Sequence, residues 1–384
     1  MKRLLIAILT LILFGTCKEK YVSPANTPVT GYLVVEGVIN AGNGLTNIVL
    51  KRTTKLDSTS IVYEKGATVF VEGQNNTKFN LLETSAGNYS ATGLGLNNAL
   101  KYRLNILTID GKKYQSDFVT VQTTPPIDSV SWKQDSLGVH FFINSHDPTN
   151  KTKYYQWDYR ETWEYHSPSV TYLKYGVFNT PPPLQYYVYF LDPVLVTWDT
   201  TITTCWQEDY SKNILTASTI SLSENKINLP LNFIPLKSIK LAVLYSINTR
   251  QYSLSEGKFQ FLQNMKKNTE STGSVFDAQP SELMGNIHCI TNPSDPVIGY
   301  LDICQNQELR IFINNSQVPD WGYKPPCSER EVQFDSTTYM HEQGYLPIRT
   351  GKRGPVPPAT IWYSTPFCVD CTLTGSNVKP KFWP

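Results

Sequence analysis

Short runs of alternating apolar and polar residues make up most of the first third of the chain, and a period of two is the pattern of β-strands. Stretches rich in Gly, Asn and Ser separate these runs, at spacings typical of a β-sandwich. The run at 101–109 leads into Asp110-Gly111, which is a strong hairpin signal. We therefore predict one sandwich of about seven strands over residues 29–125, with strand-like runs at 32–39, 47–52, 67–72, 79–83, 101–109 and 113–122.

A Thr-Thr-Pro-Pro linker at 123–126 opens a second group of runs. The longest, Tyr154–His166, is predicted to have two unlike faces, because successive side chains of a strand point to opposite sides. One face, broken by Glu161, is most simply a buried sheet face; it holds Tyr155, Trp157, Tyr159, Trp163 and Tyr165. The other holds Tyr154, Gln156, Asp158, Arg160, Thr162, Glu164 and His166. With a late strand at 239–247, this pattern resembles a fibronectin III-like domain over 126–268 with an insertion at 167–236.

One helix is predicted at the end of this domain. Ser253-Leu-Ser-Glu256 has the spacing of a capping box, and apolar residues then recur at Phe259, Leu262 and Met265. Residues 269–384 are predicted to form a C-terminal β region with many turns. The predicted fold class is therefore mostly β: tandem immunoglobulin- or fibronectin III-like sandwiches, a disulfide-stapled C-terminal β region and one short helix.

The first sixteen residues have the pattern of a secretory signal peptide. Lys2 and Arg3 precede an apolar run at 4–14, which is too short for a permanent membrane span. Small residues, Gly15 and Thr16, stand just before Cys17, where a lipoprotein signal peptidase would cut. We predict that Cys17 is lipidated and that residues 17–28 form a polar tether; the alternative is an ordinary secretory signal with a chance cysteine.

The charge of the chain excludes one class of partner. The chain has 34 Lys and Arg against 32 Asp and Glu, and loss of Lys2 and Arg3 with the signal peptide makes the two numbers equal. Nucleic-acid binding needs concentrated positive charge, so no nucleic acid is expected as a partner. No other stretch approaches 18 apolar residues, so the membrane would be reached through the lipid anchor.

Six cysteines remain beyond Cys17, and an even number in an exported chain predicts disulfides. The candidates are Cys205, Cys289, Cys304, Cys327, Cys368 and Cys371. We predict a Cys289–Cys304 bridge, because these residues lie on adjacent strand-like runs joined by a Pro-containing turn. The other four would supply the remaining bridges in an open pairing. Cys368 and Cys371 form a C-x-x-C, but no histidine stands near them, so a zinc or redox site is less favoured than structural bridges.

No recognisable catalytic constellation is present. The chain lacks the nucleophile elbow, the zinc-protease helix motif and the phosphate-binding glycine loop. The five histidines are scattered, and His140 and His146 with Asp147 are better explained as ordinary polar residues than as metal ligands. We therefore expect no enzyme activity, no metal site and no cofactor.

The insertion at 167–236 is the predicted contact surface. Five tyrosines lie beside the proline triplet 181–183, and Tyr side chains give large, rigid contact area. Loops also carry binding more often than scaffold strands do. The candidate contact residues are Tyr172, Tyr175, Tyr186, Tyr187 and Tyr189. The competing explanation is that these rings pack onto the sandwich as a lid.

Several motifs resemble those of domain of unknown function family 4249. They lie at 33–37, 205–206, 251–255, 273–281, 285–287, 297–300, 368–372 and 379–383. The resemblance implies a lipid-anchored envelope protein of Bacteroidota-like bacteria, of a kind that often occurs alongside TonB-dependent outer-membrane transporters. It implies no biochemical activity and no catalytic residue.

Two functions follow as hypotheses. The first is an outer-membrane lipoprotein that binds a peptide, glycan or metal complex as the accessory partner of a TonB-dependent transporter. The alternative is a structural or adhesive surface lipoprotein with no small-molecule ligand. Acidic residues after the lipidated cysteine would direct such a protein to the outer face. Lys18-Glu19-Lys20 supplies one acid between two lysines, so both faces of the outer membrane stay open.

Overall fold

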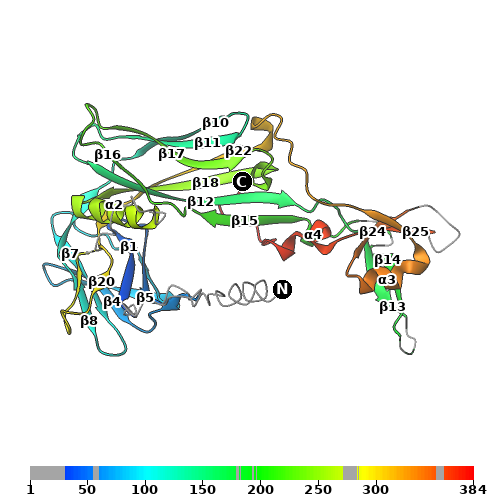
Figure 1. Cartoon of the computed structure of the whole chain (residues 1–384), viewed down its shortest axis with the longest axis horizontal. Coiled ribbons are helices and arrows are strands. Elements are labelled where there is room, and N and C mark those ends of the chain that lie inside the picture. Colours follow the sequence, from blue (N-terminus) through cyan, green and yellow to red (C-terminus); the bar gives the residue numbers. More distant parts are fainter. Residues whose placement is uncertain are drawn as a thin grey trace, which may run out of the picture.

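The computed structural model describes residues 31–54, 60–178, 181, 183–192, 194–195, 197–270, 283, 285–351 and 359–384. Cys17 and the predicted signal peptide and tether lie outside them. The described chain is mostly β, as predicted, and forms an elongated molecule (Figure 1). A β-barrel lies at one end, a two-sheet sandwich lies along the middle, and a smaller β-rich head lies at the other end. Within the described residues, no helix is both long and apolar enough to cross a membrane.

The barrel is a ring of strands that the pairing of β7 with β9 closes. In ring order its strands are β7 (Lys101–Leu107), β4 (Thr68–Gly73), β5 (Lys78–Ser85), β6 (Asn88–Thr92), β2 (Leu45–Arg52), β1 (Leu33–Asn40), β21 (Ile303–Gln305) and β9 (Val119–Thr123). Four strands attach outside the ring: β3 (Val62–Tyr63), β8 (Lys113–Ser116), β19 (Ile287–Cys289) and β20 (Val297–Ile298). Alternate side chains point inward to a fully buried core that includes Ile48, Val71 and Leu104.

This barrel corrects the predicted N-terminal sandwich. The strands predicted from the first third of the chain are present, but β1 and β9 do not pair with each other. The short strand β21 lies between them and pairs in parallel with both. A closed ring leaves no unpaired strand edge, which explains why a segment from residue 303 onward is recruited.

The sandwich consists of two sheets that face each other. One contains β10 (Ile127–Gln134), β11 (Gly138–His146) and β17 (Lys226–Pro235). The other contains β15 (Thr204–Tyr210), β12 (Tyr154–His166), β18 (Leu244–Leu254), β22 (Gln307–Asn314) and β16 (Leu215–Ser218). The predicted aromatic face of β12 is largely buried between the sheets, where Tyr155 and Trp157 pack with Phe141 of the opposite sheet.

Glu161, which interrupts the aromatic face, is buried with three partners. The hydroxyl of Tyr245 donates to one carboxylate oxygen at 2.6 Å, and the Asn232 amide donates to the same oxygen at 2.8 Å. The Lys240 ammonium lies 2.6 Å from the other oxygen. A buried carboxylate is tolerated only when it is paired and hydrogen-bonded in this way.

The head combines two distant parts of the chain. The hairpin of β13 (Leu173–Val177) and β14 (Tyr186–Phe190) packs with β23 (Arg330–Gln333), β24 (Leu346–Thr350), β25 (Thr360–Ser364) and α3 (Thr337–Glu342). Of the predicted insertion at 167–236, this hairpin projects into the head, whereas β15, β16 and β17 belong to the sandwich. The predicted C-terminal β region, which begins at residue 269, is not a separate unit. Residues 287–305 contribute strands to the barrel, 307–314 to the sandwich and 330–364 to the head.

Helix α2 (Glu256–Glu270) covers the junction of barrel and sandwich (Figure 1). Ser253 lies within β18, so the predicted capping serine is two residues early. Ser255 caps the helix instead: its Oγ accepts from the backbone N–H of Lys258 at 3.3 Å, and it donates to Asp302 at 3.1 Å. The remaining short helices of the described residues are η1 (Thr200–Ile202), η2 (Ile239–Leu241), η3 (Asn315–Gln317), η4 (Phe334–Ser336), α4 (Pro366–Val369) and η5 (Cys371–Leu373).

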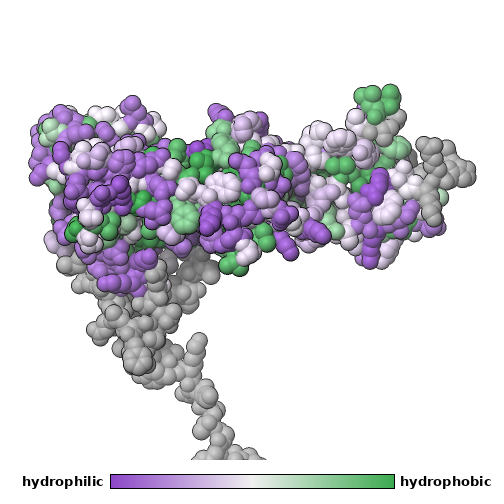
Figure 2. Space-filling model, turned by 90° about the horizontal axis from the view of Figure 1, so that it is seen from above, coloured by the Kyte–Doolittle hydropathy of each residue, from purple (hydrophilic) through white to green (hydrophobic). Residues whose placement is uncertain are grey.

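The face of the molecule that Figure 2 shows is mostly polar, with scattered apolar residues and an apolar group that projects near the end of the head. Several large apolar side chains of the head and its adjoining loop are between 45% and 85% exposed. They are Val177, Phe178, Leu184, Tyr189, Val194, Leu195 and Trp198.

Candidate functional site

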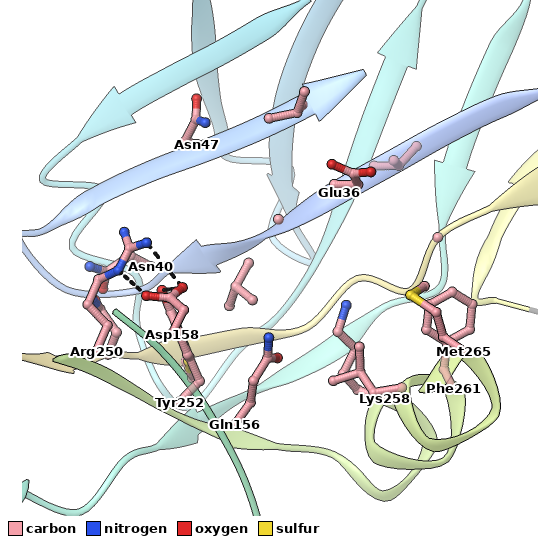
Figure 3. A pocket seen from close by; sticks show the side chains of 18 of the residues that line it. Glu36, Asn40, Asn47, Gln156, Asp158, Arg250, Tyr252, Lys258, Phe261 and Met265 are labelled. Carbon is pink, nitrogen blue, oxygen red and sulfur yellow. Dashed lines mark hydrogen bonds and ion pairs between the residues drawn. The ribbon is translucent and has the colours of Figure 1, made fainter. Parts of the chain in front are cut away.

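A cavity of about 500 Å³ lies where the barrel, the sandwich and α2 meet (Figure 3). The outward-facing residues of β1 and β2 form one wall. The predicted polar face of β12, together with β18, forms the second wall, and α2 forms the third. A cavity of this size at a junction between structural units, lined by apolar groups and a few polar ones, is typical of a small-molecule site.

One end of the cavity is polar. The Arg250 guanidinium holds the Asp158 carboxylate through two contacts, at 2.7 and 3.1 Å, and the Tyr252 hydroxyl donates to the same carboxylate at 3.0 Å. Burial raises the pKa of Tyr252, and the Asp158 charge raises it further, so the phenol stays protonated. Gln156 lies beside this group, and its buried amide oxygen has no hydrogen-bond partner within the described part of the chain.

The α2 wall carries one cation among apolar side chains. Lys258, Phe261, Leu262 and Met265 line the cavity. The Lys258 side chain is buried, and its ammonium donates to the backbone oxygen of Tyr300 at 2.7 Å. Burial lowers the pKa of Lys258 to about 8, although Asp302 and Glu36 act in the opposite direction. The lysine therefore still carries a positive charge at neutral pH.

Cys304 also lines the cavity, and Asp302 lies close to this wall, where it contacts Ser255 at the start of α2. Burial raises the pKa of Asp302 to about 6, even though one carboxylate oxygen accepts from the Ser255 backbone N–H at 2.8 Å. The other oxygen is buried without a partner in the described structure. Burial also raises the pKa of the Cys304 thiol to about 12, which makes the thiol a poor nucleophile.

The structure places four of the five candidate tyrosines on the two faces of the head hairpin, and Tyr172 lies just before it. Tyr175 and Tyr186 point inward: the Tyr175 hydroxyl donates to the Tyr345 backbone oxygen at 2.8 Å, and Tyr186 stacks on His341 at 3.6 Å between ring centres. Burial raises the pKa of Tyr175 well above its usual range. These two rings therefore belong to the core of the head.

Tyr187 and Tyr189 lie on the outer face of the same hairpin. The Tyr187 ring covers Gly176, so closely that a side chain at Gly176 would meet the ring. It packs against Phe178 at 4.8 Å and against Tyr189 at 6.0 Å between ring centres. Tyr172 lies apart from this pair, where its ring contacts Trp198 edge to face at 6.0 Å.

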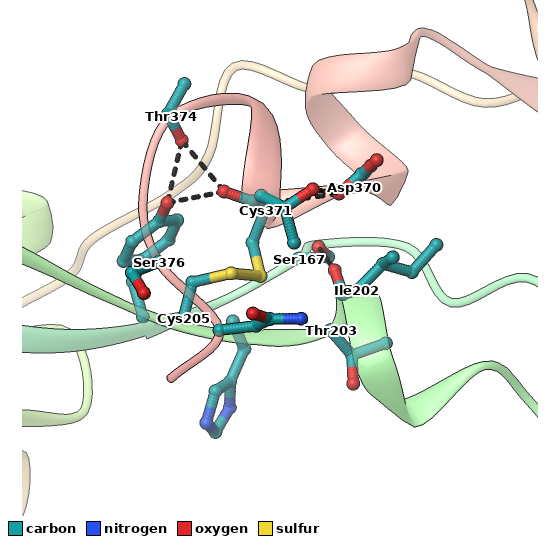
Figure 4. The surroundings of a disulfide bond; sticks show 12 residues. Ser167, Ile202, Thr203, Cys205, Asp370, Cys371, Thr374 and Ser376 are labelled. Atoms are coloured by element: carbon teal, nitrogen blue, oxygen red, sulfur yellow. Dashed lines mark hydrogen bonds between the residues drawn. A yellow bond between two sulfur atoms is a disulfide. The ribbon is translucent and has the colours of Figure 1, made fainter. Parts of the chain in front are cut away.

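Four of the candidate cysteines form two disulfides, Cys205–Cys371 and Cys327–Cys368. The first joins β15 of the sandwich to η5, where the Tyr165 hydroxyl also donates to the Cys371 backbone oxygen at 2.7 Å (Figure 4). The second joins the chain before β23 to α4. Both cysteines of the first bridge belong to the buried cluster of the sandwich, and the second bridge lies beside the head. The C-x-x-C cysteines therefore belong to two different bridges.

The predicted Cys289–Cys304 bridge is wrong, because both thiols are free and buried. The prediction assumed that the runs on either side of the turn pair with each other. Instead β19 pairs with β8, whereas β21 pairs with β1 and β9. The two thiols consequently lie in different apolar clusters.

The scattered histidines have ordinary polar partners. His146 contacts the Asp128 carboxylate at 2.7 Å, and His140 contacts Asp135 at 2.9 Å. Asp147 instead accepts from the backbone N–H groups of Thr149 and Thr152 at 2.9 and 2.8 Å. In the part of the chain that the structure describes, no three His, Cys, Asp or Glu side chains are grouped so that they could hold a metal ion.

Of the residues that line the cavity, sequence reasoning named only Cys304 as a candidate site residue, and that as a disulfide candidate. It missed the others, although two signals pointed toward them. The even-numbered face of 154–166 is polar in an otherwise aromatic strand, and it supplies Gln156 and Asp158. The motif at 251–255 supplies Tyr252. Lys258 had no such signal, because the expected apolar spacing on the helix started from Phe259.

Comparison with known proteins yields a family but no activity. The family model described as "Domain of unknown function (DUF4249)" matches residues 19–310, a range that contains every residue lining the cavity but ends before β23, β24 and β25. No curated protein matches the chain. Among solved structures, a chitinase, ChiA74 from Bacillus thuringiensis, is similar at 12% identity over 55% of this chain, with a TM-score of 0.14. The match spans 30% of that chitinase chain, and a likeness this low carries no argument.

Proposed function

The chain belongs to the DUF4249 family of domains of unknown function, and from this premise we propose that it is a lipid-anchored binding protein of the outer membrane, the accessory partner of a TonB-dependent transporter. The observation that carries the binding role is the cavity between barrel, sandwich and α2. The anchor is inferred from the apolar run before Cys17. The transporter partner is inferred from the family resemblance, which implies a protein that occurs alongside TonB-dependent transporters.

The cavity supports binding because its polar groups are costly in an empty apolar site. Lys258 and Gln156 each have unused hydrogen-bonding capacity within the described structure. Buried polar groups without partners cost free energy, which a bound ligand would recover. The apolar lining would supply most of the affinity, and the polar groups would orient the ligand.

The outer face of the head supports a partner-binding role at the opposite end of the molecule. Phe178, Tyr187 and Tyr189 form an aromatic group on a hairpin whose inner face is anchored in the head core. Exposed aromatic rings on a rigid base are favourable anchors for a protein partner, since little conformational entropy is lost on binding.

Co-purification with the detergent-extracted chain tests the transporter partnership. The wild-type chain is expected to bring down a TonB-dependent transporter, identified by mass spectrometry. A variant with Phe178→Ser, Tyr187→Ser and Tyr189→Ser should lose the transporter with an unchanged melting temperature. The matched control removes exposed apolar groups elsewhere, Ile109→Ser and Leu137→Ser, and should keep the transporter. Absence of any transporter from the wild-type sample would refute this part of the proposal.

Fractionation of a Cys17→Ser variant tests the anchor separately. This variant should stay soluble in the periplasm or stall as an uncleaved precursor. A variant that fractionates with the membrane in mature form, as wild type does, would show that the attachment lies elsewhere.

A structural or adhesive role is the second candidate, and the exposed apolar end of the head favours it. In that case the variant with three serines on the head would impair attachment between cells or within the envelope. Substitutions that line the cavity would then have no effect on the biological role.

A further inference from the structure

The cavity wall formed by α2 has an unusual composition for a packed helix face. Lys258, Phe261, Leu262 and Met265 are spaced by three, four and seven residues from the first, so they share one face of the helix. Three of the four are apolar, and the fourth is a lysine at the N-terminal end of the stripe. A buried lysine is rare unless it is paired.

Lys258 has no paired carboxylate among the described residues. Its side chain is only 7% exposed, and no carboxylate oxygen of that part of the chain lies within 4.0 Å of its ammonium. The ammonium has three donors, and the Tyr300 backbone oxygen takes one of them. The ammonium also lies 5.7 Å from the centre of the Phe261 ring, and two of its three donors have no hydrogen-bond acceptor within the described chain.

The two acids whose charges act on Lys258, Glu36 and Asp302, are engaged with other residues. Glu36, which faces Lys258 from β1 across the cavity, pairs with Lys51 at 2.6 Å (Figure 3). Asp302 accepts from the backbone N–H and the hydroxyl of Ser255 at the start of α2, at 2.8 and 3.1 Å. Their negative charges nevertheless act on Lys258, so the site would suit a ligand with one negative charge and disfavour a dianion.

The apolar stripe defines the other part of the ligand. Met265 lies seven residues after Lys258, which corresponds to about 10 Å along the helix axis at 1.5 Å per residue. Val34 and Val38 of β1 also line the cavity and face this stripe with apolar surface. An apolar body about 10 Å long would therefore lie between the helix and the barrel.

We propose that the cavity binds a small apolar carboxylate, whose carboxylate oxygens accept from the Lys258 ammonium and whose apolar body lies along Phe261, Leu262 and Met265. This inference rests on the proposed binding function and adds the chemical class of the ligand. The apolar body can be a hydrocarbon chain or the side chains of a short peptide, because both join an apolar surface to one carboxylate.

Calorimetric titration of the purified chain with matched probes tests this inference. Octanoate represents the hydrocarbon carboxylate and N-acetyl-leucylleucine the peptide carboxylate. Octanol and octylamine keep the apolar chain but change the charge. At least one carboxylate should bind in a 1:1 ratio and at least tenfold more tightly than octanol, and octylamine should bind weakest. The tighter of the two carboxylates identifies the apolar body.

Two variants separate the charge from the cavity. Lys258→Met keeps a long apolar side chain, and it should weaken carboxylate binding at least tenfold while octanol binding stays the same. Lys112→Met is the control: it removes a lysine that pairs with Asp295 on the barrel, away from the cavity lining. Equal binding of octanoate and octanol, unchanged in Lys258→Met, would overturn the inference but leave a binding cavity. Failure of every probe to bind wild type would count against the proposed small-molecule site itself.

Discussion

The barrel and the head are both rich in β-strands, but they are stabilised differently. Within the described residues, the barrel buries one continuous apolar cluster of 21 residues, and the two cysteines on its strands stay unpaired. The head buries a cluster of only four, and the two disulfides lie near the segments that connect it to the sandwich, Cys205–Cys371 in the sandwich cluster and Cys327–Cys368 before β23. Buried apolar surface alone stabilises a large core, whereas a small core gains from covalent links.

This difference also suggests a division of roles. The cavity lies against the outer wall of the barrel, where rigid strands hold one side of it. The exposed aromatic group lies on the head, at the far end of the sandwich (Figure 1). A head fixed by disulfides can present a surface to a partner without having a large core of its own.

Removal of the Cys327–Cys368 bridge should cause the largest difference in stability between the head and the barrel. The bridge closes a loop with a sequence separation of 41 residues, which corresponds to about 4 kcal/mol in the chain-entropy account of disulfides. In a Cys327→Ser, Cys368→Ser variant, hydrogen exchange should accelerate in β24 and β25 but not in β4 and β7. Equal acceleration in the barrel would contradict the idea that the two regions are stabilised separately.

A cavity in the barrel core should produce the reverse pattern. Leu104 is fully buried in the barrel cluster, and Leu104→Ala should lower the free energy of unfolding by about 3 kcal/mol. Exchange should then accelerate in β4 and β7 while β24 and β25 keep their protection. The solvent-exposed Leu82→Ala on β5 is the control and should change stability very little.

Acid should destabilise the sandwich through Asp147. Burial alone would raise the pKa of this carboxylate, but hydrogen bonds from Thr149 and Thr152 together lower it to about 2. A lowered pKa stabilises the fold above the unfolded value near 4, and this contribution, about 2 kcal/mol, is lost as the pH falls from 4 to 2. Asp147→Asn should remove this part of the pH dependence of unfolding. If the variant loses as much stability as wild type between pH 4 and 2, other carboxylates are responsible for the acid sensitivity.

The smallest expected effect concerns the core of the head. Tyr175→Phe removes the hydrogen bond to the Tyr345 backbone oxygen and keeps the ring, so the head should lose about 1 kcal/mol. Tyr189→Phe on the outer face is the matched control and should be neutral for the melting temperature. A larger loss from the outer-face change would mean that Tyr189, and not Tyr175, contributes to the core.

Local patterns predicted most of the individual strands. The alternation over 154–166 identified both faces of β12, and the buried face has the aromatic composition that was expected. The same alternation contained part of the site, since Gln156 and Asp158 lie on the polar face. The helix was also predicted, but its cap was placed two residues early, because β18 extends through Ser253 and Leu254.

Pairings between distant segments could not be predicted in this way. The Cys289–Cys304 bridge was inferred from a short connection, yet each of the two strands pairs with a partner from the first third of the chain. Lys258 became a candidate only when the structure placed it opposite Glu36 on β1, more than two hundred residues earlier in the sequence (Figure 3).

The sequence by itself determined the strand-rich composition, the alternation of buried and polar faces, the helix and the presence of disulfides. These features depend on residues close together in the chain, where the period of the side chains is a direct consequence of backbone geometry. Only the tertiary structure decided that β21 closes a barrel, that Cys205 pairs with Cys371, and that Lys258 lies beside an apolar cavity. These outcomes depend on which surfaces pack together once the strands have formed. The segments that pack are far apart in the sequence, so a local pattern of residues does not predict which of them will meet.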